Sequence, residues 1–259
     1  MLKSRIIPVL LIKDKGLVKT IKFKDPKYVG DPINAVKIFN EKEVDELTVL
    51  DIDASSDGRE PDYKTIANLA SECRMPLCYG GGIKSVDQAQ KILSLGVEKV
   101  ALSSAAIENP NLISQLAARV GRQSVVVILD VKKKFIGNKY ECFIYNGTKN
   151  TKLCPYNFAL KAQELGAGEI VINSIDQDGV MKGYDLPFVS NFKSKVTVPV
   201  TVLGGAGDYE HLTKLIEQEG IIGAAAGSLF VFKGKYRAVL INYPKNIEKE
   251  KILASINKF

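Results

Sequence analysis

The sequence is poor in the residues on which metal and acid–base sites most often depend. It has one histidine, His211, which lies beside Glu210 in a predicted surface helix. A single histidine excludes a histidine-rich metal site, and this position makes His211 a poor general base. The four cysteines are Cys73, Cys78, Cys142 and Cys154. Their spacing matches no pattern of paired metal ligands, so we expect reduced thiols, no metal ion and no other cofactor.

Long apolar runs and secretory signals are also missing. No apolar run reaches the ~18–20 residues that a membrane-spanning helix needs. At the N-terminus, Lys3 and Arg5 precede only a short apolar strand, unlike a signal peptide. The net charge is +7, but the lysines are scattered and form no aromatic-interleaved nucleic-acid site. We therefore expect a cytoplasmic protein that binds neither membranes nor nucleic acid, and whose charge suits a phosphorylated small molecule or an acidic partner surface.

Strand-like and helix-like runs alternate from one end of the chain to the other. The predicted strands cover residues 5–12, 46–52, 75–79, 99–103, 124–131, 168–174, 199–203 and 221–226. The predicted helices include residues 31–42, 62–73, 85–95, 110–119, 155–165 and 208–218. Eight strands alternating with helices, with no linker between them, predict a single α/β domain over residues 1–259, a (β/α)8 TIM barrel. An open, doubly wound sheet is the alternative.

The two halves of the chain repeat each other. Residues 5–13 and 124–132 are similar apolar strands that both end in lysine, at a separation of roughly 120 residues. Nearly the same shift relates the glycine loops after the third and seventh predicted strands. A constant shift predicts a two-fold, half-barrel internal repeat and disfavours the open sheet. It also aligns Asp130 of the second half with Leu11 of the first.

Two long segments interrupt the alternation of strands and helices. Residues 14–30 read as a long polar loop after the first strand. Residues 135–152 read as a β-hairpin, because apolar residues alternate along them and Asn146-Gly147 supplies a turn. Both segments follow the C-terminal end of a strand, where a TIM barrel carries its active site.

Two loops rich in small residues have the composition of phosphate cradles. The first contains Gly80, Gly81, Gly82, Ser103 and Ser104, and the second contains Gly204, Gly205, Gly207, Gly227 and Ser228. Glycine lets backbone N–H groups approach an anion, and the N-terminus of a following helix adds a favourable dipole. Two such loops at symmetric positions predict a long ligand with a phosphate at each end. The alternative is that the glycines only turn each strand into its helix.

Asp130 is the candidate catalytic residue. It ends the apolar strand 124–131 directly before a loop, so it could act as a general acid or base. The alternative is a carboxylate that caps a loop amide. Acid–base catalysis across a substrate usually needs a second group, and the repeat places that group at position 11. Leu11 cannot transfer a proton.

Four charged residues stand at the opposite ends of the predicted strands. They are Arg5, Glu46, Lys99 and Glu169. In a barrel these four positions could form a ring of alternating charge around the axis. The alternative is that they are ordinary charged residues at strand starts.

Over nearly all of residues 1–230, the chain resembles HisF, the cyclase subunit of imidazole glycerol phosphate synthase. The resemblance is carried by a series of short motifs: Arg5-Ile-Ile-Pro, Val18-Lys19, Gly30-Asp31-Pro32, Asp45-Glu46-Leu47, Gly80-Gly81-Gly82-Ile83, Glu108-Asn109-Pro110, Gly166-Ala167-Gly168-Glu169-Ile170, Ser174-Ile175-Asp176-Gln177-Asp178-Gly179, Gly183-Tyr184-Asp185 and Gly204-Gly205-Ala206-Gly207. Their order along the chain makes the resemblance specific.

The resemblance implies a two-phosphate barrel that docks a HisH-like glutaminase subunit on its N-terminal face. Ammonia from the glutaminase would pass along the barrel axis to the C-terminal face. The family's salt-bridge gate matches the four charged residues named above, and its flexible-loop lysine matches Lys19. The implied phosphate contacts are Gly82, Ser104, Asp178, Gly179, Gly205 and Ser228.

The departures from the family pattern concentrate in the reaction centre. The two catalytic aspartates of the family fall at Leu11 and Asp130, so one is lost. Four further positions differ from the family's polar contacts: Ser103, Asn146, Asn173 and Leu203. Together with residues 234–244, these departures look like a HisF-like branch associated with sugar amidation in surface-polysaccharide pathways. In that branch the pair supplies ammonia to a separate amidotransferase that makes an acetamidino sugar.

Three hypotheses remain open at this stage. The first is an ammonia-delivering subunit with little or no cyclase activity. The second is a true cyclase, in which Asp51 or Asp53 would have to replace the missing acid. The third is a phosphate-binding barrel without a glutaminase partner.

Overall fold

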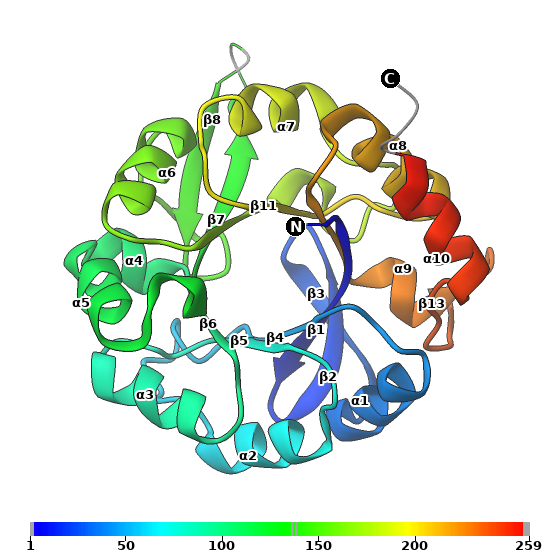
Figure 1. Ribbon diagram of the computed structural model, residues 1–259, viewed down its shortest axis with the longest axis horizontal. Helices are drawn as coiled ribbons and strands as arrows, with labels where there is room; N and C mark the ends of the chain where they lie inside the picture. The colour runs from blue at the N-terminus through cyan, green and yellow to red at the C-terminus, as the bar shows by residue number, and fades with distance from the viewer. Residues whose placement is uncertain (1–2, 136, 138, 256–259) are drawn as a thin grey trace.

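Eight parallel strands close into a barrel, as the sequence predicts (Figure 1). The computed structural model describes residues 3–135, 137 and 139–255. Around the barrel the strands are β1 (Arg5–Lys13), β4 (Leu47–Asp51), β5 (Leu77–Gly80), β6 (Lys99–Leu102), β7 (Val125–Lys133), β10 (Glu169–Ser174), β11 (Val200–Leu203) and β12 (Gly223–Ala226). The eight strands follow one another in the order β10, β11, β12, β1, β4, β5, β6 and β7, and β7 pairs back with β10. The barrel is therefore closed, and the open-sheet alternative is excluded.

Helices between the strands form the outer ring (Figure 1). They are α1 (Pro32–Glu41), α2 (Tyr63–Glu72), α3 (Val86–Ser94), α4 (Ser104–Glu108), α5 (Asn111–Val120), α6 (Pro155–Glu164), α7 (Leu186–Lys193), α8 (Tyr209–Glu219), α9 (Ser228–Val231) and α10 (Asn246–Leu253). Sequence-encoded caps begin several of them. The Ser85 hydroxyl, for example, accepts a hydrogen bond from the Gln88 N–H at 3.2 Å and satisfies an amide at the start of α3. None of the described helices is long and apolar enough to cross a bilayer.

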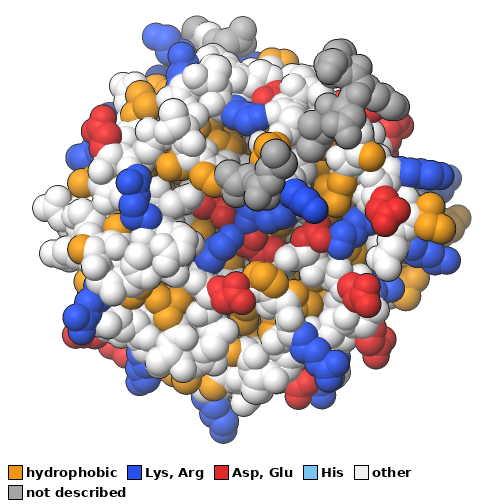
Figure 2. Space-filling view, viewed as in Figure 1, with side chains coloured by type: hydrophobic (Ala, Val, Ile, Leu, Met, Phe, Trp, Pro, Cys, Tyr) orange, Lys and Arg blue, Asp and Glu red, His pale blue; other side chains and the backbone are white. Residues whose placement is uncertain are grey.

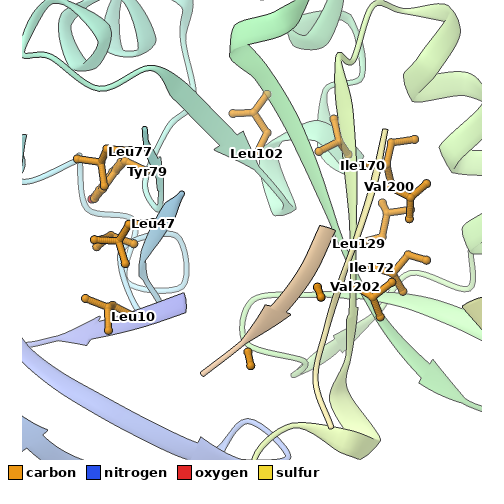
Figure 3. Close-up of a cluster of buried hydrophobic side chains, with 14 of the residues drawn as sticks. Leu10, Leu47, Leu77, Tyr79, Leu102, Leu129, Ile170, Ile172, Val200 and Val202 are labelled. Carbon is orange, nitrogen blue, oxygen red and sulfur yellow. The ribbon is translucent and has the colours of Figure 1, made fainter. Parts of the chain in front are cut away.

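The strands divide the apolar core into two parts. Alternate side chains of each strand point outward and pack under the helices, as Leu10, Leu129 and Ile172 do in Figure 3. The side chains between them point inward and fill the barrel, among them Val9 and Ile128. This two-residue alternation is a property of the extended chain, and it points every second side chain of a strand toward the barrel axis.

The half-barrel repeat is visible in the strands themselves. Both β1 and β7 are nine residues long, and each continues into an antiparallel strand beyond the barrel. After β7 the chain forms β8 (Tyr140–Ile144) and β9 (Lys149–Asn150), joined by a turn at Tyr145 and Asn146 with φ near +53°. The hairpin predicted within residues 135–152 is therefore confirmed, although residues 136 and 138 lie outside the described part of the chain.

The prediction of a polar loop over residues 14–30 was wrong. These residues form an antiparallel hairpin of β2 (Gly16–Ile21) and β3 (Lys24–Gly30), and β2 also pairs with β1. The turns that shape it use positive φ angles at Asp14-Lys15 and Lys22-Phe23. Neither pair contains the glycine that usually marks such turns, so the sequence carried no clear signal for the hairpin.

The C-terminal segment returns to the N-terminal side of the barrel. After α9 a short hairpin of β13 (Phe232–Lys233) and β14 (Ala238–Val239) leads into α10, which packs against α8. The Tyr243 hydroxyl donates to the Ile6 carbonyl at 2.9 Å, and Lys249 pairs with Asp45 at 2.5 Å. These contacts attach the end of the chain to the starts of β1 and β4.

Candidate functional site

A pocket of about 130 Å³ lies at the C-terminal ends of the strands. It brings together residues from both halves of the chain that the sequence singled out: Leu11, Lys19, Gly82, Ser103, Ser104, Asp130, Asp178, Gly179, Gly205, Gly227 and Ser228. Both glycine loops therefore face one cavity. Its position is the usual place of an active site in a TIM barrel.

Two of the loop glycines are required by the backbone. Gly82 has φ +73°, and a Cβ atom there would lie 2.9 Å from the Arg59 carbonyl oxygen. Gly205 has φ +119°, and its Cβ would lie 2.1 Å from the Gly183 carbonyl oxygen. Any other residue would strain the loop and push the neighbouring chain away. These glycines keep the backbone close to the cavity, where N–H groups can meet an anion.

Asp130 lies half-buried in the floor of this pocket. Its carboxylate accepts hydrogen bonds from the Asn173 amide at 2.8 Å and from the Ser103 hydroxyl at 3.1 Å. Burial raises the pKa of Asp130 to about 6, although the two hydrogen bonds favour the charged form and oppose the shift. Such a group can hold or release a proton near neutral pH.

Asp130 should titrate near pH 6, and Asn173→Leu should move its midpoint higher because an N–H donor to the carboxylate is lost. The folded-state pKa is raised, so the stabilising contribution of Asp130 is present below its unfolded value of 3.8 and is lost as pH rises through about 6. Carbon-13 NMR of the carboxyl group measures both midpoints. Asn191→Leu, whose amide donates to the Tyr156 hydroxyl instead, is the matched control. An Asp130 midpoint at the ordinary carboxyl value would contradict the expectation.

Position 11 offers no proton donor, and the nearby acids are engaged elsewhere. Leu11 pairs in register with Leu50 and packs against the apolar interior of the barrel. Asp51 lines the pocket, but Arg59 donates to it at 3.3 Å. Asp53 forms an ion pair with Lys13 and accepts from the Asn146 amide at 2.8 Å. Both candidate replacements for a second acid are therefore held by cationic partners.

The β2–β3 hairpin covers the pocket and is held down by Asp178. The Asp178 carboxylate accepts hydrogen bonds from the Thr20 hydroxyl at 2.6 Å and the Phe23 N–H at 3.0 Å. Burial raises the pKa of Asp178. From the same hairpin, the buried Lys19 ammonium donates to the Val9 carbonyl at 2.6 Å, and burial lowers its pKa to about 8. Asp178, which the family resemblance implied as a phosphate contact, thus holds the hairpin in place.

Asp178→Ala should loosen the β2–β3 hairpin without unfolding the barrel. Losing two hydrogen bonds to a carboxylate should speed amide hydrogen exchange in residues 16–30 by roughly ten- to a hundredfold. Asp176→Ala is the matched control, because Asp176 accepts from the Lys133 N–H at 2.9 Å and so supports the other hairpin. Equal exchange in the two variants would contradict a specific role for Asp178.

The four charged residues meet around the axis at the N-terminal ends of the strands. The Arg5 guanidinium contacts Glu46 and lies 2.8 Å from Glu169, and the Lys99 ammonium lies 2.9 Å from Glu46 and 3.0 Å from Glu169. Figure 2 shows this face, with side chains of both charges near its centre. We call Arg5, Glu46, Lys99 and Glu169 the charged ring. The ring alternates in sign, so each ion has two opposite neighbours.

The Glu169 carboxylate of the charged ring is held in its ionised form although it is buried. Burial works to raise the pKa of Glu169, but Arg5 and Lys99 hold it below its usual value. The Thr201 hydroxyl also donates to Glu169, at 2.6 Å. Above the ring a second cavity of about 10 Å³, roughly the room one water molecule needs, lies inside the barrel.

With the charged ring, the small cavity and the C-terminal pocket described, the sequence of the chain can be compared with those of known proteins. The family model described as "Histidine biosynthesis protein" matches residues 5–237. A Hyphomonas neptunium protein named imidazole glycerol phosphate synthase subunit HisF is 41% identical, over 90% of this chain and 91% of its own. The chain belongs to the HisF family.

Other HisF relatives are more similar still, and their names assign them provisionally. A Vibrio vulnificus protein assigned in this way as imidazole glycerol phosphate synthase subunit hisF3 is 67% identical, over 98% of this chain and 97% of its own. A Pseudomonas aeruginosa protein, provisionally assigned as imidazole glycerol phosphate synthase subunit hisF2, is 56% identical over 94% of this chain and 97% of its own. The match extends over the barrel and both glycine loops.

Several site residues of this HisF chain were not found from its sequence. Thr20 and Phe23 reach the pocket only because residues 14–30 form a hairpin, and the sequence predicted a loop there. Ser55, whose hydroxyl accepts from the Gly82 N–H at 3.3 Å, carried no motif. The β-branched residues Val18, Thr20 and Ile21 favour a strand and were the one available signal.

Proposed function

We propose that this HisF-like chain delivers ammonia and has weak or no cyclase activity. A HisH-like glutaminase subunit would dock on the N-terminal face and release ammonia at the charged ring. The ammonia would pass along the barrel axis to a sugar amidotransferase that makes an acetamidino sugar of a surface polysaccharide. The observation that carries the proposal is the axial series of charged ring, small cavity and pocket, in which Leu11 occupies the position of the second acid.

The axial path supports transfer of a small neutral molecule. The charged ring, the small cavity and the pocket follow one another, and all three are lined by inward-facing residues of the barrel strands. A buried ring of four ions is costly to assemble in an apolar interior, since each ion must leave water. A barrel that only bound phosphates would have no need for it, so the ring disfavours the third hypothesis.

The proposed weakness of cyclase activity rests on the residues around Leu11. Without a carboxylate at position 11, the pocket would need another acid to work with Asp130. The ion pairs of Asp51 with Arg59 and of Asp53 with Lys13 occupy the nearest candidates. The retained glycine loops still suit a phosphorylated small molecule, bound without ring closure.

A true cyclase subunit is the alternative function. It is supported by the overall match to relatives named as imidazole glycerol phosphate synthase subunits, such as the HisF of Streptococcus mutans at 39% identity. In this case ammonia and the ribulosyl-formimino substrate would give imidazole glycerol phosphate and an aminoimidazole carboxamide ribotide. Asp130 would then act with a group other than residue 11.

The two functions separate in one assay. The purified chain is given the ribulosyl-formimino substrate and an ammonium salt, with Streptococcus mutans HisF as the positive control. The proposal expects turnover far below that of the control, together with formation of a stable complex with the HisH-like glutaminase on size-exclusion chromatography. Turnover equal to the control would overturn the proposal in favour of a cyclase. Failure to bind any glutaminase at micromolar concentration would overturn the ammonia path.

A further inference from the structure

A short hairpin of the C-terminal segment lies beside the pocket. It consists of β13 and β14, which are joined by a turn over residues 234–237. From this turn the Arg237 guanidinium donates a hydrogen bond to the Gly179 carbonyl at 3.4 Å. Gly179 lines the C-terminal pocket. The hairpin therefore borders the side of the barrel from which a transferred molecule would leave.

The β13–β14 hairpin is joined to the β2–β3 hairpin through an aromatic ring. The centre of the buried Phe232 ring lies 4.7 Å from the Arg237 guanidinium carbon and 6.0 Å from the Lys27 ammonium. Cations at such distances are attracted to the face of a ring. Lys27 belongs to β3, so the two hairpins contact each other. Together they form a continuous surface beside the pocket.

Apolar side chains of the β13–β14 hairpin are exposed to solvent. Tyr236 is 91% exposed, Val239 is 47% exposed and Leu240 is 51% exposed. Single exposed apolar residues are ordinary on a protein surface, but three within five consecutive residues form a patch. Tyrosine and arginine are also enriched where proteins bind one another. This composition favours a protein as the partner of the hairpin.

The cations of the hairpin have no acidic partner on this chain. Lys233 and Lys235 are exposed, and Arg237 is partly exposed. Within the residues that the structure describes, none of the three forms an ion pair, and neither does the neighbouring Lys27. A surface of one sign attracts a protein surface of the opposite sign and speeds its association. We call the following residues the hairpin surface: Lys233, Lys235, Tyr236, Arg237, Val239 and Leu240.

We infer that the hairpin surface is the docking site for an acidic face of the sugar amidotransferase that receives the ammonia. The inference rests on the proposed function for the identity of this partner. Docking at the hairpin places the amidotransferase against the pocket, whereas the glutaminase would bind at the opposite ends of the strands. Both proteins can then bind at once. The cations speed the encounter, and Tyr236 supplies the apolar contact that becomes buried.

The test uses the sugar amidotransferase of the same organism, purified by its amidation activity with ammonium salt, which needs no other subunit. Surface plasmon resonance measures its binding to the wild type, to Lys233→Glu/Lys235→Glu and to Tyr236→Ala. The dissociation constant should rise at least about tenfold in each variant, and the double charge reversal should also slow association. Lys64→Glu/Lys161→Glu reverses two exposed lysines on α2 and α6 and is the matched control, which should bind like the wild type.

Equal affinity of the wild type and the hairpin variants, or no binding of the amidotransferase to the wild type, would overturn the docking site. Two further measurements test other occupants: binding to vesicles of phosphatidylglycerol and phosphatidylcholine, and sedimentation of the chain alone. Vesicle binding or self-association that the hairpin variants abolish, with amidotransferase affinity unchanged, would assign the surface to a membrane or to a second copy and overturn the inference.

Delivery of ammonia is measured separately, as glutamine-dependent amidation by the amidotransferase, the glutaminase and this chain together. If the wild type and the hairpin variants support it equally, the docking site fails and the proposed function stands. If the amidotransferase binds through the hairpin surface but no glutamine-dependent amidation occurs, the proposed function fails and the docking site stands. Unchanged glutaminase binding in the variants shows that their barrel is intact.

Discussion

The substitution Leu11→Asp is expected to raise cyclase turnover with ammonium salt by about 10²-fold. The half-barrel repeat aligns position 11 with Asp130, and both residues line the same pocket. An aspartate at position 11 would lie partly buried beside Leu50, where burial raises a carboxyl pKa toward neutrality. The pocket would then hold two carboxyl groups on strands of opposite halves, one to give and one to take a proton.

The measurement compares initial rates of imidazole glycerol phosphate formation for the wild type, Leu11→Asp and Leu11→Asn. Asparagine has the shape and polarity of aspartate but transfers no proton, so it should stay at the wild-type level. A gain shared by both variants would mean that polarity or space, not proton transfer, limits the reaction. No gain in Leu11→Asp, with a folded protein and a bound substrate, would mean that other changes in the pocket also disable it.

Glu169→Gln is expected to lower the free energy of unfolding by about 3 kcal/mol at neutral pH. Glu169 is the partner of both Arg5 and Lys99, and its loss leaves two cations with one carboxylate, Glu46. The value stands at the lower end for a broken buried pair, because the Arg5 and Lys99 side chains keep 26% and 18% of their exposure and remain partly solvated. Chemical denaturation of both proteins gives the difference.

The pH dependence of that difference tests its electrostatic origin. Because the folded-state pKa of Glu169 is lowered, its stabilising contribution is present above the unfolded value of 4.5 and is lost as pH falls through the folded value. The gap between wild type and Glu169→Gln should therefore be constant at neutral pH and shrink on acidification below about 4.5. Glu210→Gln, in an exposed pair with Lys214, is the matched control and should leave the free energy of unfolding almost unchanged. Equal losses in both variants would contradict the prediction.

The barrel could be predicted from the sequence because its signals are local. Alternating apolar runs, the Ser85 cap and the Gly-Asp-Pro start of α1 each depend on a few neighbouring residues. The β2–β3 hairpin could not, because its turns at Asp14-Lys15 and Lys22-Phe23 adopt positive φ without glycine. Tertiary contacts such as the Asp178 bonds hold these turns, and no local pattern encodes such contacts.

The candidate site was only partly accessible to the same reasoning. The glycine loops and Asp130 stand at strand ends, so their meeting follows from the barrel itself. The four charged strand starts also predict a ring of alternating charge, and the closed barrel brings Arg5 and Lys99 into contact with both glutamates. The inward positions of Leu50 and Leu203 had no sequence signal, because an inward leucine and an outward leucine look alike until the register is known.

The hydrogen bonds across the pocket make the two halves of the barrel mutually dependent. Asp178 of the second half holds Thr20 of the first, and the Ser104 hydroxyl of the first half accepts from the Tyr145 N–H of the second at 3.1 Å. Each half thus supplies a hydrogen-bond acceptor that holds the other half's hairpin. If the chain were divided into its two halves, the fragments would have to associate before either hairpin could form these contacts. Leu11 takes part in neither hydrogen bond, so its side chain can change without breaking these contacts between the two halves.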